Sequence, residues 1–248
     1  LKFIDELRKY IVSEVCKDLL SYVKQIDRVV FNERDLQLYL SDKLKSSGHY
    51  GDVYLEYRLP RGVNSNFDEG YAPWKTECPS IDIVLEIGNR FIAIELKNKL
   101  KSFSANLSRF GESANVQILK NQSAQNIGRY QFWKDVKRLE LLKQSYKNVL
   151  GGVALFLTND TNYQNTTSDA DYAAFSMERG CKKGGKNSKA LDWGSPIKKG
   201  KDGEELMDKS GNPIRKSPEI KLDETYSPSW EEAFAIDKEK FHCCYVVV

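Results

Sequence analysis

The sequence predicts an α/β domain in which a central mixed β-sheet is flanked by helices. Three patterns indicate this fold class: helical apolar periodicity over residues 1–25, a two-residue hairpin turn at Gly88-Asn89, and an unbroken apolar run from Val153 to Leu157. Because 40% of the 248 residues are hydrophobic, the chain can bury a sizeable core. We therefore expect a single domain over residues 1–248.

Two helices are expected before the sheet. The first covers residues 1 to about 25. The second follows Asn32, an N-cap residue with Asp35 in the reciprocal capping position, and runs to about Lys45, where Ser46-Ser47-Gly48 ends it. Its expected inward stripe is Glu33, Leu36, Leu40 and Leu44.

An antiparallel meander is expected next. Alternating side chains predict a strand over residues 53–58, and residues 60–79 are expected to be loop. Strands over 81–87 and 90–96 are joined by Gly88-Asn89, with Gly88 at the position that needs a positive φ. In this register Ile87 faces Arg90 and Asp82 faces Glu95. One face then carries Ile81, Ile83, Leu85, Ile87, Ile92, Ile94 and Leu96 against the core, and the other carries Asp82, Glu95 and Lys97.

The second half of the chain is expected to add one helix, two strands and an insertion. After a polar stretch of about 25 residues, a helix over roughly 124–146 presents Phe132, Val136, Leu139 and Lys143 on one face. The strand 153–157 is buried on both faces and ends at Thr158-Asn159-Asp160, and a final strand covers 241–248. Between them lies a basic, loop-rich insertion over about 176–217, in which eleven Lys or Arg stand against five Asp or Glu from Arg179 to Lys216.

The composition narrows the chemistry that the chain can perform. The net charge of +3 indicates neither a nucleic-acid nor a membrane partner by itself, and no apolar run approaches the roughly 20 residues of a membrane helix. Five cysteines without a CxxC pair favour a reducing, cytoplasmic setting over a disulfide framework or a zinc knuckle. Only two histidines argue against a His-rich metal centre and Ser-His-Asp catalysis. We therefore expect carboxylates and lysines to carry the chemistry.

The acid pair on the hairpin is the strongest candidate site. Opposed Cβ atoms on one face lie about 5 Å apart, where two carboxylates repel by about 3 kcal/mol at an effective dielectric constant of about 20. Lys97 can neutralise one of them, and a hard divalent cation between Asp82 and Glu95 accounts for both. Two plainer explanations stay open: the pair is part of a solvated sheet face, and Glu33 interacts favourably with the helix dipole.

These residues also carry a family resemblance. Pro79-Ser80-Ile81-Asp82 followed by Glu95-Leu96-Lys97 resembles the PD-(D/E)xK nuclease superfamily, also called restriction endonuclease-like. The resemblance covers about residues 30–160 and includes the order of helices and strands. One departure is that Pro79 stands three residues before Asp82 and not next to it.

The resemblance implies a restriction endonuclease-like core with a role for each motif residue. Glu33 corresponds to the helix carboxylate, Asp82 and Glu95 to the metal ligands, and Lys97 to the lysine that positions water. The implied cofactor is Mg²⁺, with Mn²⁺ as its substitute, and the Leu96 carbonyl oxygen would also contact the ion. Auxiliary candidates on the second helix are Gln125, Tyr130 and Gln131, for which an ordinary polar helix start is the alternative.

The predicted activity is Mg²⁺-dependent hydrolysis of phosphodiester bonds by a DNA endonuclease of restriction or defence type. Its predicted substrate is double-stranded DNA, and a homodimer is expected by analogy, because a two-fold pair with one site each suits the cutting of two strands. Two alternatives are a catalytically silent nucleic-acid-binding or assembly module of the same fold, and a structural protein with no nucleic-acid role. Candidates for phosphate contacts are Lys101, Arg109, Lys120, Lys182, Lys183, Lys186 and Lys189. For any single lysine of the basic insertion, a solvated and disordered loop is the favoured alternative.

Overall fold

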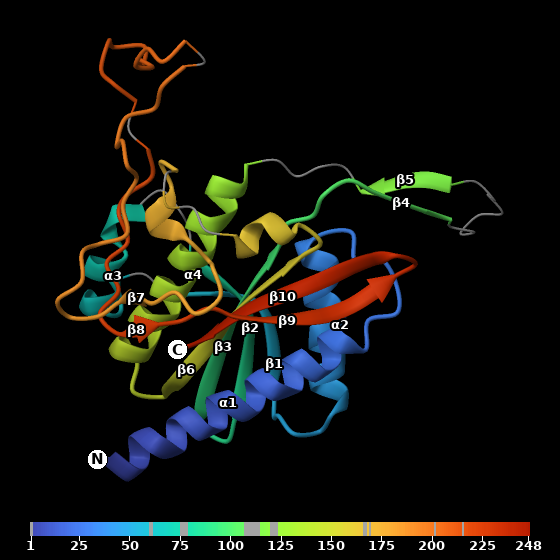
Figure 1. The fold of residues 1–248 in the computed structure, drawn as a ribbon. Helices are drawn as coiled ribbons and strands as arrows, with labels where there is room; N and C mark the ends of the chain where they lie inside the picture. The colour runs from blue at the N-terminus through green and yellow to red at the C-terminus, as the bar shows by residue number, and fades with distance from the viewer. Residues whose placement is uncertain are drawn as a thin grey trace.

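The chain forms a six-stranded mixed sheet with helices on both faces (Figure 1). The computed structural model describes residues 2–59, 62–74, 79–106, 115–119, 124–165, 168, 170–200, 202–214 and 216–248. The strand order is β1-β2-β3-β6-β10-β9, in which β3 and β6 run parallel and the other neighbours antiparallel. The α/β class and the mixed sheet are therefore confirmed. The strands are β1 (Val53–Arg58), β2 (Ser80–Ile87), β3 (Arg90–Asn98), β6 (Val149–Thr158), β9 (Ser229–Ile236) and β10 (Glu239–Val247).

Helices α1 (Lys2–Lys24) and α2 (Glu33–Ser46) pack on one face of the sheet. Asn32 caps α2 as predicted, since its side chain accepts a hydrogen bond from the Asp35 amide at 3.0 Å. The return bond differs from the prediction, because Asp35 accepts from the amide of Phe31 and pairs with Arg28. The inward stripe also differs: Glu33 is only half-buried, and Gln37 is buried beside Leu36, Leu40 and Leu44.

The β2–β3 hairpin has the predicted register, with Ile87 opposite Arg90 and Gly88 at φ +59°. Ladder pairing ends at Ile83 and Ile94, so Asp82 and Glu95 are not a ladder pair. Instead, the Leu96 amide donates to Asp82 Oδ2 at 2.6 Å. The chain is irregular here, and Ile81 packs in the core on the α4 side of the sheet, not with Ile83 and Leu85 as predicted.

Helix α4 (Gln125–Ser145) covers the other face of the sheet. Phe132, Val136 and Leu139 are buried as predicted, but α4 is buried around most of its circumference and not on one face alone. The reason is that segments between β6 and β9 wrap its outer side and contribute Phe175, Trp193 and other apolar residues to the same core (Figure 1). β6 is buried on both faces, which confirms that prediction.

Several elements were not predicted. Residues 60–79 contain helix α3 (Ser65–Gly70), capped by Asn64, and the 3₁₀ turn η1 (Ala72–Trp74) in place of a continuous loop. The polar stretch after β3 contains a projecting hairpin, β4 (Phe103–Asn106) and β5 (Asn115–Leu119) (Figure 1). β9 was also missed, whereas the final strand was predicted within two residues at its start and one at its end.

The basic insertion is partly core and partly a projection. Its Leu191 and Trp193 are buried against the α4 side of the sheet. Residues 196–200 and 202–214 extend away from the body as an arm, drawn in orange in Figure 1. Short elements complete the fold: β7 (Lys183–Gly184), β8 (Thr225–Tyr226), η2 (Thr161–Gln164) and η3 (Ala173–Phe175). Of the helices that the structure describes, none combines the length and the hydropathy needed to cross a membrane.

Candidate functional site

Charged side chains of β2, β3 and α4 meet on the α4 side of the sheet, where Glu33 from α2 also reaches Lys97. One of them comes from α2 (Glu33), one from β2 (Asp82), two from β3 (Glu95 and Lys97) and two from α4 (Asp135 and Arg138). Together they form what we call the charged cluster, which consists of Glu33, Asp82, Glu95, Lys97, Asp135 and Arg138. Both β3 members point to the α4 side because side chains two residues apart on a strand share a face. The cluster therefore brings together the four residues predicted to be catalytic.

Glu95 is held by an ion pair that the sequence did not predict. Its Oε1 lies 2.8 Å from Arg138 Nη1, and the two side chains are 1% and 10% exposed. Arg138 also donates to the Ser80 carbonyl at 2.9 Å and lies 3.4 Å from Asp135 Oδ1. Burial raises the pKa of Glu95 well above its usual 4.5, against the opposing effect of Arg138.

The Lys97 ammonium lies among oxygen atoms from three elements. It donates to the Leu96 carbonyl at 2.8 Å and lies 3.2 Å from Asp135 Oδ2 and 3.4 Å from Glu33 Oε1. Burial disfavours the charged form of Lys97, but Asp135 and the other carboxylates outweigh burial and raise its pKa above the usual 10.5. Lys97 is therefore a permanent cation at neutral pH and not a general base.

Asp82 lies within β2 and accepts hydrogen bonds at two of its oxygen atoms. Its Oδ2 accepts from the Leu96 amide, and its carbonyl oxygen accepts from Gln37 Nε2 at 2.6 Å. Beside it on β1, Glu56 has φ +49°, a strained value for a residue with a side chain. Burial raises the pKa of Asp82 to about 6, with Lys97 and the Leu96 amide acting in the opposite direction.

The charges of the cluster do not cancel. Four carboxylates face two cations, so two negative charges are in excess when every group is ionised. Carboxylate and carbonyl oxygens are the donors that Mg²⁺ prefers, so the donor chemistry and the charge fit a divalent cation. The placement fits less well, because within the described ranges no three His, Cys, Asp or Glu side chains form a group that could hold a metal ion. Lys97 contacts the Leu96 carbonyl, and Arg138 contacts Glu95, at the atoms expected to bind the ion.

The auxiliary candidates on α4 have different surroundings. Gln125 donates a hydrogen bond to Asp160. Tyr130 lies in an aromatic cluster, where it accepts from Trp74 Nε1 and donates to the Pro218 carbonyl. Both residues therefore have other partners, and in the part of the chain described neither contacts the charged cluster. Gln131 lies one helical turn before Asp135 on the same side of α4. Of the three, only Gln131 lies on the helix face that carries the cluster.

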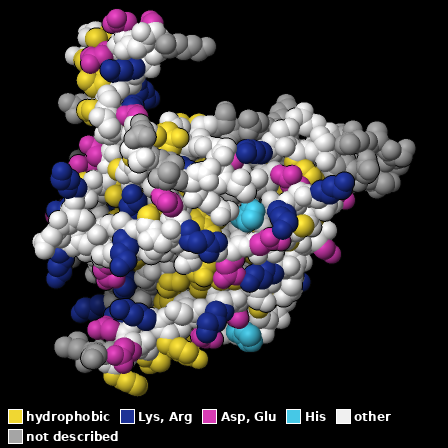
Figure 2. Space-filling model, in the orientation of Figure 1, with side chains coloured by type: hydrophobic (Ala, Val, Ile, Leu, Met, Phe, Trp, Pro, Cys, Tyr) yellow, Lys and Arg dark blue, Asp and Glu magenta, His cyan; other side chains and the backbone are white. Residues whose placement is uncertain are grey.

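Of the seven residues predicted to contact phosphate, the structure describes five. Lys101 Nζ lies 2.7 Å from Asp160 Oδ1, beyond the end of β3. Lys183 is half-buried in β7, whose partner strand contains Tyr226, and Tyr226 donates to Glu140 on α4. Lys182, Lys186 and Lys189 are exposed, while Arg109 and Lys120 lie outside the described residues. Basic and acidic side chains are interspersed on the face seen in Figure 2.

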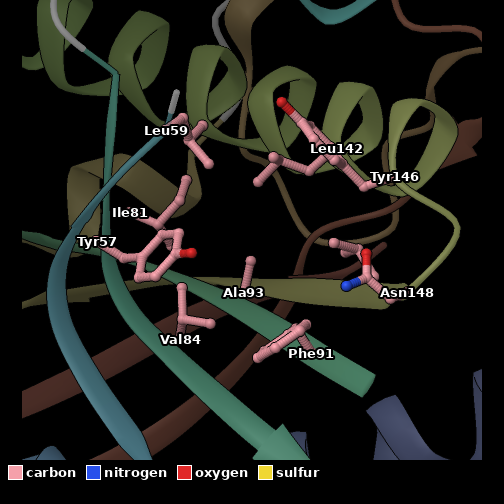
Figure 3. Close-up of a pocket in the computed structure, with 10 residues that line it drawn as sticks. Tyr57, Leu59, Ile81, Val84, Phe91, Ala93, Leu142, Tyr146 and Asn148 are labelled. Carbon is pink, nitrogen blue, oxygen red and sulfur yellow. The ribbon is translucent and has the colours of Figure 1, made fainter. Parts of the chain in front are cut away.

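An apolar cavity of about 130 Å³ lies elsewhere, between β1–β3 and the C-terminal half of α4 (Figure 3). Val84 and Ala93 line it from the sheet, Leu142 and Tyr146 line it from α4, and none of its lining residues is charged. This cavity offers apolar contacts and no acid, base or nucleophile beyond two tyrosines. This cavity therefore offers less acid–base chemistry than the charged cluster does.

Three residues of this site were missed by sequence reasoning: Gln37, Asp135 and Arg138. The available signal was a polar stripe at helical spacing, Gln131, Asp135 and Arg138, beside the apolar stripe of α4. Comparison of the chain with protein-family models, with curated proteins and with solved structures gave no match.

Proposed function

We propose that this protein is a metal-dependent nuclease that hydrolyses phosphodiester bonds, specifically a DNA endonuclease of restriction or defence type with Mg²⁺ or Mn²⁺ as cofactor. The observation that carries the proposal is the meeting of Asp82, Glu95 and Lys97 on neighbouring strands, with Glu33 reaching Lys97 from α2. The order α2-β1-β2-β3-α4-β6, with β6 parallel to β3, supports it as well, because it is the order that the PD-(D/E)xK resemblance implies.

In this proposal Asp82, Glu95, Glu33 and the Leu96 carbonyl oxygen would hold the metal ion. The ion would offset the negative charge that develops at phosphorus and lower the pKa of bound water. Lys97 would orient the attacking water or stabilise the same charge, since its raised pKa keeps it protonated. Double-stranded DNA is the proposed substrate, a homodimer the proposed assembly for cutting two strands, and the cytoplasm the proposed location.

The second candidate is a catalytically silent nucleic-acid-binding or assembly module of the same fold. The ion pair between Glu95 and Arg138 favours it, because a carboxylate held at 2.8 Å by a guanidinium is less available to a metal ion. This candidate predicts DNA binding that weakens with salt, without cleavage.

A plasmid cleavage assay tests the proposal. Supercoiled DNA is incubated with the wild-type protein in Mg²⁺ or in EDTA, and with the variants Lys97→Ala and Lys240→Ala. We expect cutting only with Mg²⁺, a loss of about 100-fold or more for Lys97→Ala, and no change for Lys240→Ala, whose exposed side chain pairs with Glu232. Equal cutting by Lys97→Ala and wild type would refute the proposal. Binding without cutting by the wild type would favour the silent module.

A further inference from the structure

We propose that Asp135 is a positioning residue that holds the Lys97 ammonium in place for the reaction. This inference deepens the proposed nuclease function and rests on it. Lys97 Nζ lies 3.2 Å from Asp135 Oδ2, so α4 reaches across the sheet face to the lysine of the Glu-x-Lys motif. The Glu-x-Lys motif of β3 does not by itself predict a carboxylate at this position of α4.

Asp135 has the surroundings of a group that is present for its charge. Its side chain is 2% exposed, and among the described residues neither carboxylate oxygen accepts a hydrogen bond. It forms ion pairs with Lys97 and Arg138, at 3.2 and 3.4 Å. A buried carboxylate is costly unless it is paired, so a position on α4 chosen for packing alone would favour an apolar side chain.

The contacts of Lys97 show why Asp135 matters more than Glu33. The Glu33 side chain is 40% exposed, so water competes with it for the ammonium. Asp135 is shielded from water and fixed on a long, packed helix. The Leu96 carbonyl holds the ammonium from its own strand, which limits its distance but not its direction across the site. The buried Asp135 carboxylate therefore holds the Lys97 ammonium from the α4 side.

Arg138 completes the arrangement. Glu95 and Lys97 are two residues apart on β3, and Asp135 and Arg138 are three apart on α4, so each pair occupies one face of its element. Arg138 contacts Glu95 and Asp135, and Asp135 contacts Lys97, which links the two motif residues through α4. Glu95 thereby pairs with Arg138 and Asp135 with Lys97, and these contacts hold Glu95 and Lys97 in their relative position.

The test compares Asp135→Asn with Glu140→Gln. Glu140 is the matched control, since it is a buried carboxylate on the same helix that pairs with Lys137 and accepts from the Asp223 and Glu224 amides outside the charged cluster. Two experiments are done on each variant. The first measures kcat and KM for Mg²⁺-dependent DNA cleavage, and the second records the ¹H–¹⁵N NMR resonance of the Lys97 ammonium, assigned with Lys97→Arg. A held ammonium exchanges its protons slowly enough to be seen.

We expect Asp135→Asn to lower kcat by about 100-fold with little change in KM, and to abolish the ammonium resonance. Glu140→Gln should keep both kcat and the resonance, even if it unfolds more easily. The inference is overturned if Asp135→Asn cuts like the wild type, or if its ammonium resonance is unchanged. If the wild type does not cut at all, the proposed nuclease function fails, and the resonance alone decides whether Asp135 holds Lys97.

Discussion

Replacing Asp82 by Asn should make the protein more stable at neutral pH. The folded chain raises the pKa of Asp82 from 3.8 to about 6, mainly through burial. A carboxyl whose pKa is raised by folding binds its proton more tightly in the folded state, so stability falls as the pH rises through the interval from about 4 to about 6. A difference of about two pKa units corresponds to about 3 kcal/mol of folding stability. The wild type has this contribution at low pH, where the carboxyl is protonated, and has lost all of it above pH 6.

Asn removes this cost while keeping the local hydrogen bond. Its side-chain oxygen can still accept from the Leu96 amide, as Asp82 Oδ2 does at 2.6 Å. In metal-free buffer at pH 8, we expect Asp82→Asn to unfold with a free energy higher than that of the wild type by up to about 3 kcal/mol. Near pH 4 the two proteins should differ by much less, because the wild-type carboxyl is then largely protonated.

Urea denaturation in EDTA at pH 8 and pH 4 measures this difference. Asp42→Asn is the control, because Asp42 is an exposed aspartate on α2 and its replacement should change stability by no more than about 0.5 kcal/mol. An Asp82→Asn protein that is less stable than wild type at pH 8, with the same dependence on urea, would show that Asp82 is not held in an unfavourable environment.

Two further predictions concern the same cluster. Mg²⁺ at about 100 times its Kd should raise the unfolding free energy of the wild type by about 2.7 kcal/mol in thermal melts, and an equal shift in Asp82→Asn would contradict the assignment of Asp82 as a ligand. Arg138→Ala should lower the unfolding free energy in urea by about 3–5 kcal/mol, because it leaves Glu95 and Asp135 buried without this cation. The control Arg34→Ala, at a side chain that is 71% exposed, should lower it by less than about 1 kcal/mol, and equal losses for the two variants would contradict this account.

The parts of the fold that local patterns determine could be predicted from the sequence. The Gly88 turn fixed the hairpin register, because a two-residue turn allows only one pairing of the flanking strands. Apolar period predicted α1, α2 and α4, and the run from Val153 to Leu157 predicted a strand covered on both faces. Extrapolating the hairpin to Asp82 and Glu95 was wrong in detail, because Gln37, 45 residues away, binds the Asp82 carbonyl and the ladder ends there.

The surroundings of α4 could not be predicted, because they depend on contacts between distant segments. Periodicity shows which residues share a helix face, but it does not show whether a polar face meets water or other charges. The face of Asp135 and Arg138 meets Glu95 and Lys97, and the opposite side is covered by residues such as Phe175 and Trp193. The same limit applies to the basic insertion, whose composition gave no sign that Trp193 belongs to the core.

The charged cluster is better explained by chemistry than by stability. Breaking a buried ion pair is costly, but replacing the whole network by apolar side chains of similar volume is often neutral or stabilising. Asp82 and Glu95 both have raised pKa values, so the fold holds these carboxyls where their charged forms are disfavoured. A divalent cation would relieve that cost and would be bound more tightly because of it. Burial of these carboxyls, with the neighbouring carboxylates as a smaller contribution, therefore both disfavours their charged forms in the metal-free protein and would strengthen the Mg²⁺ binding that we propose.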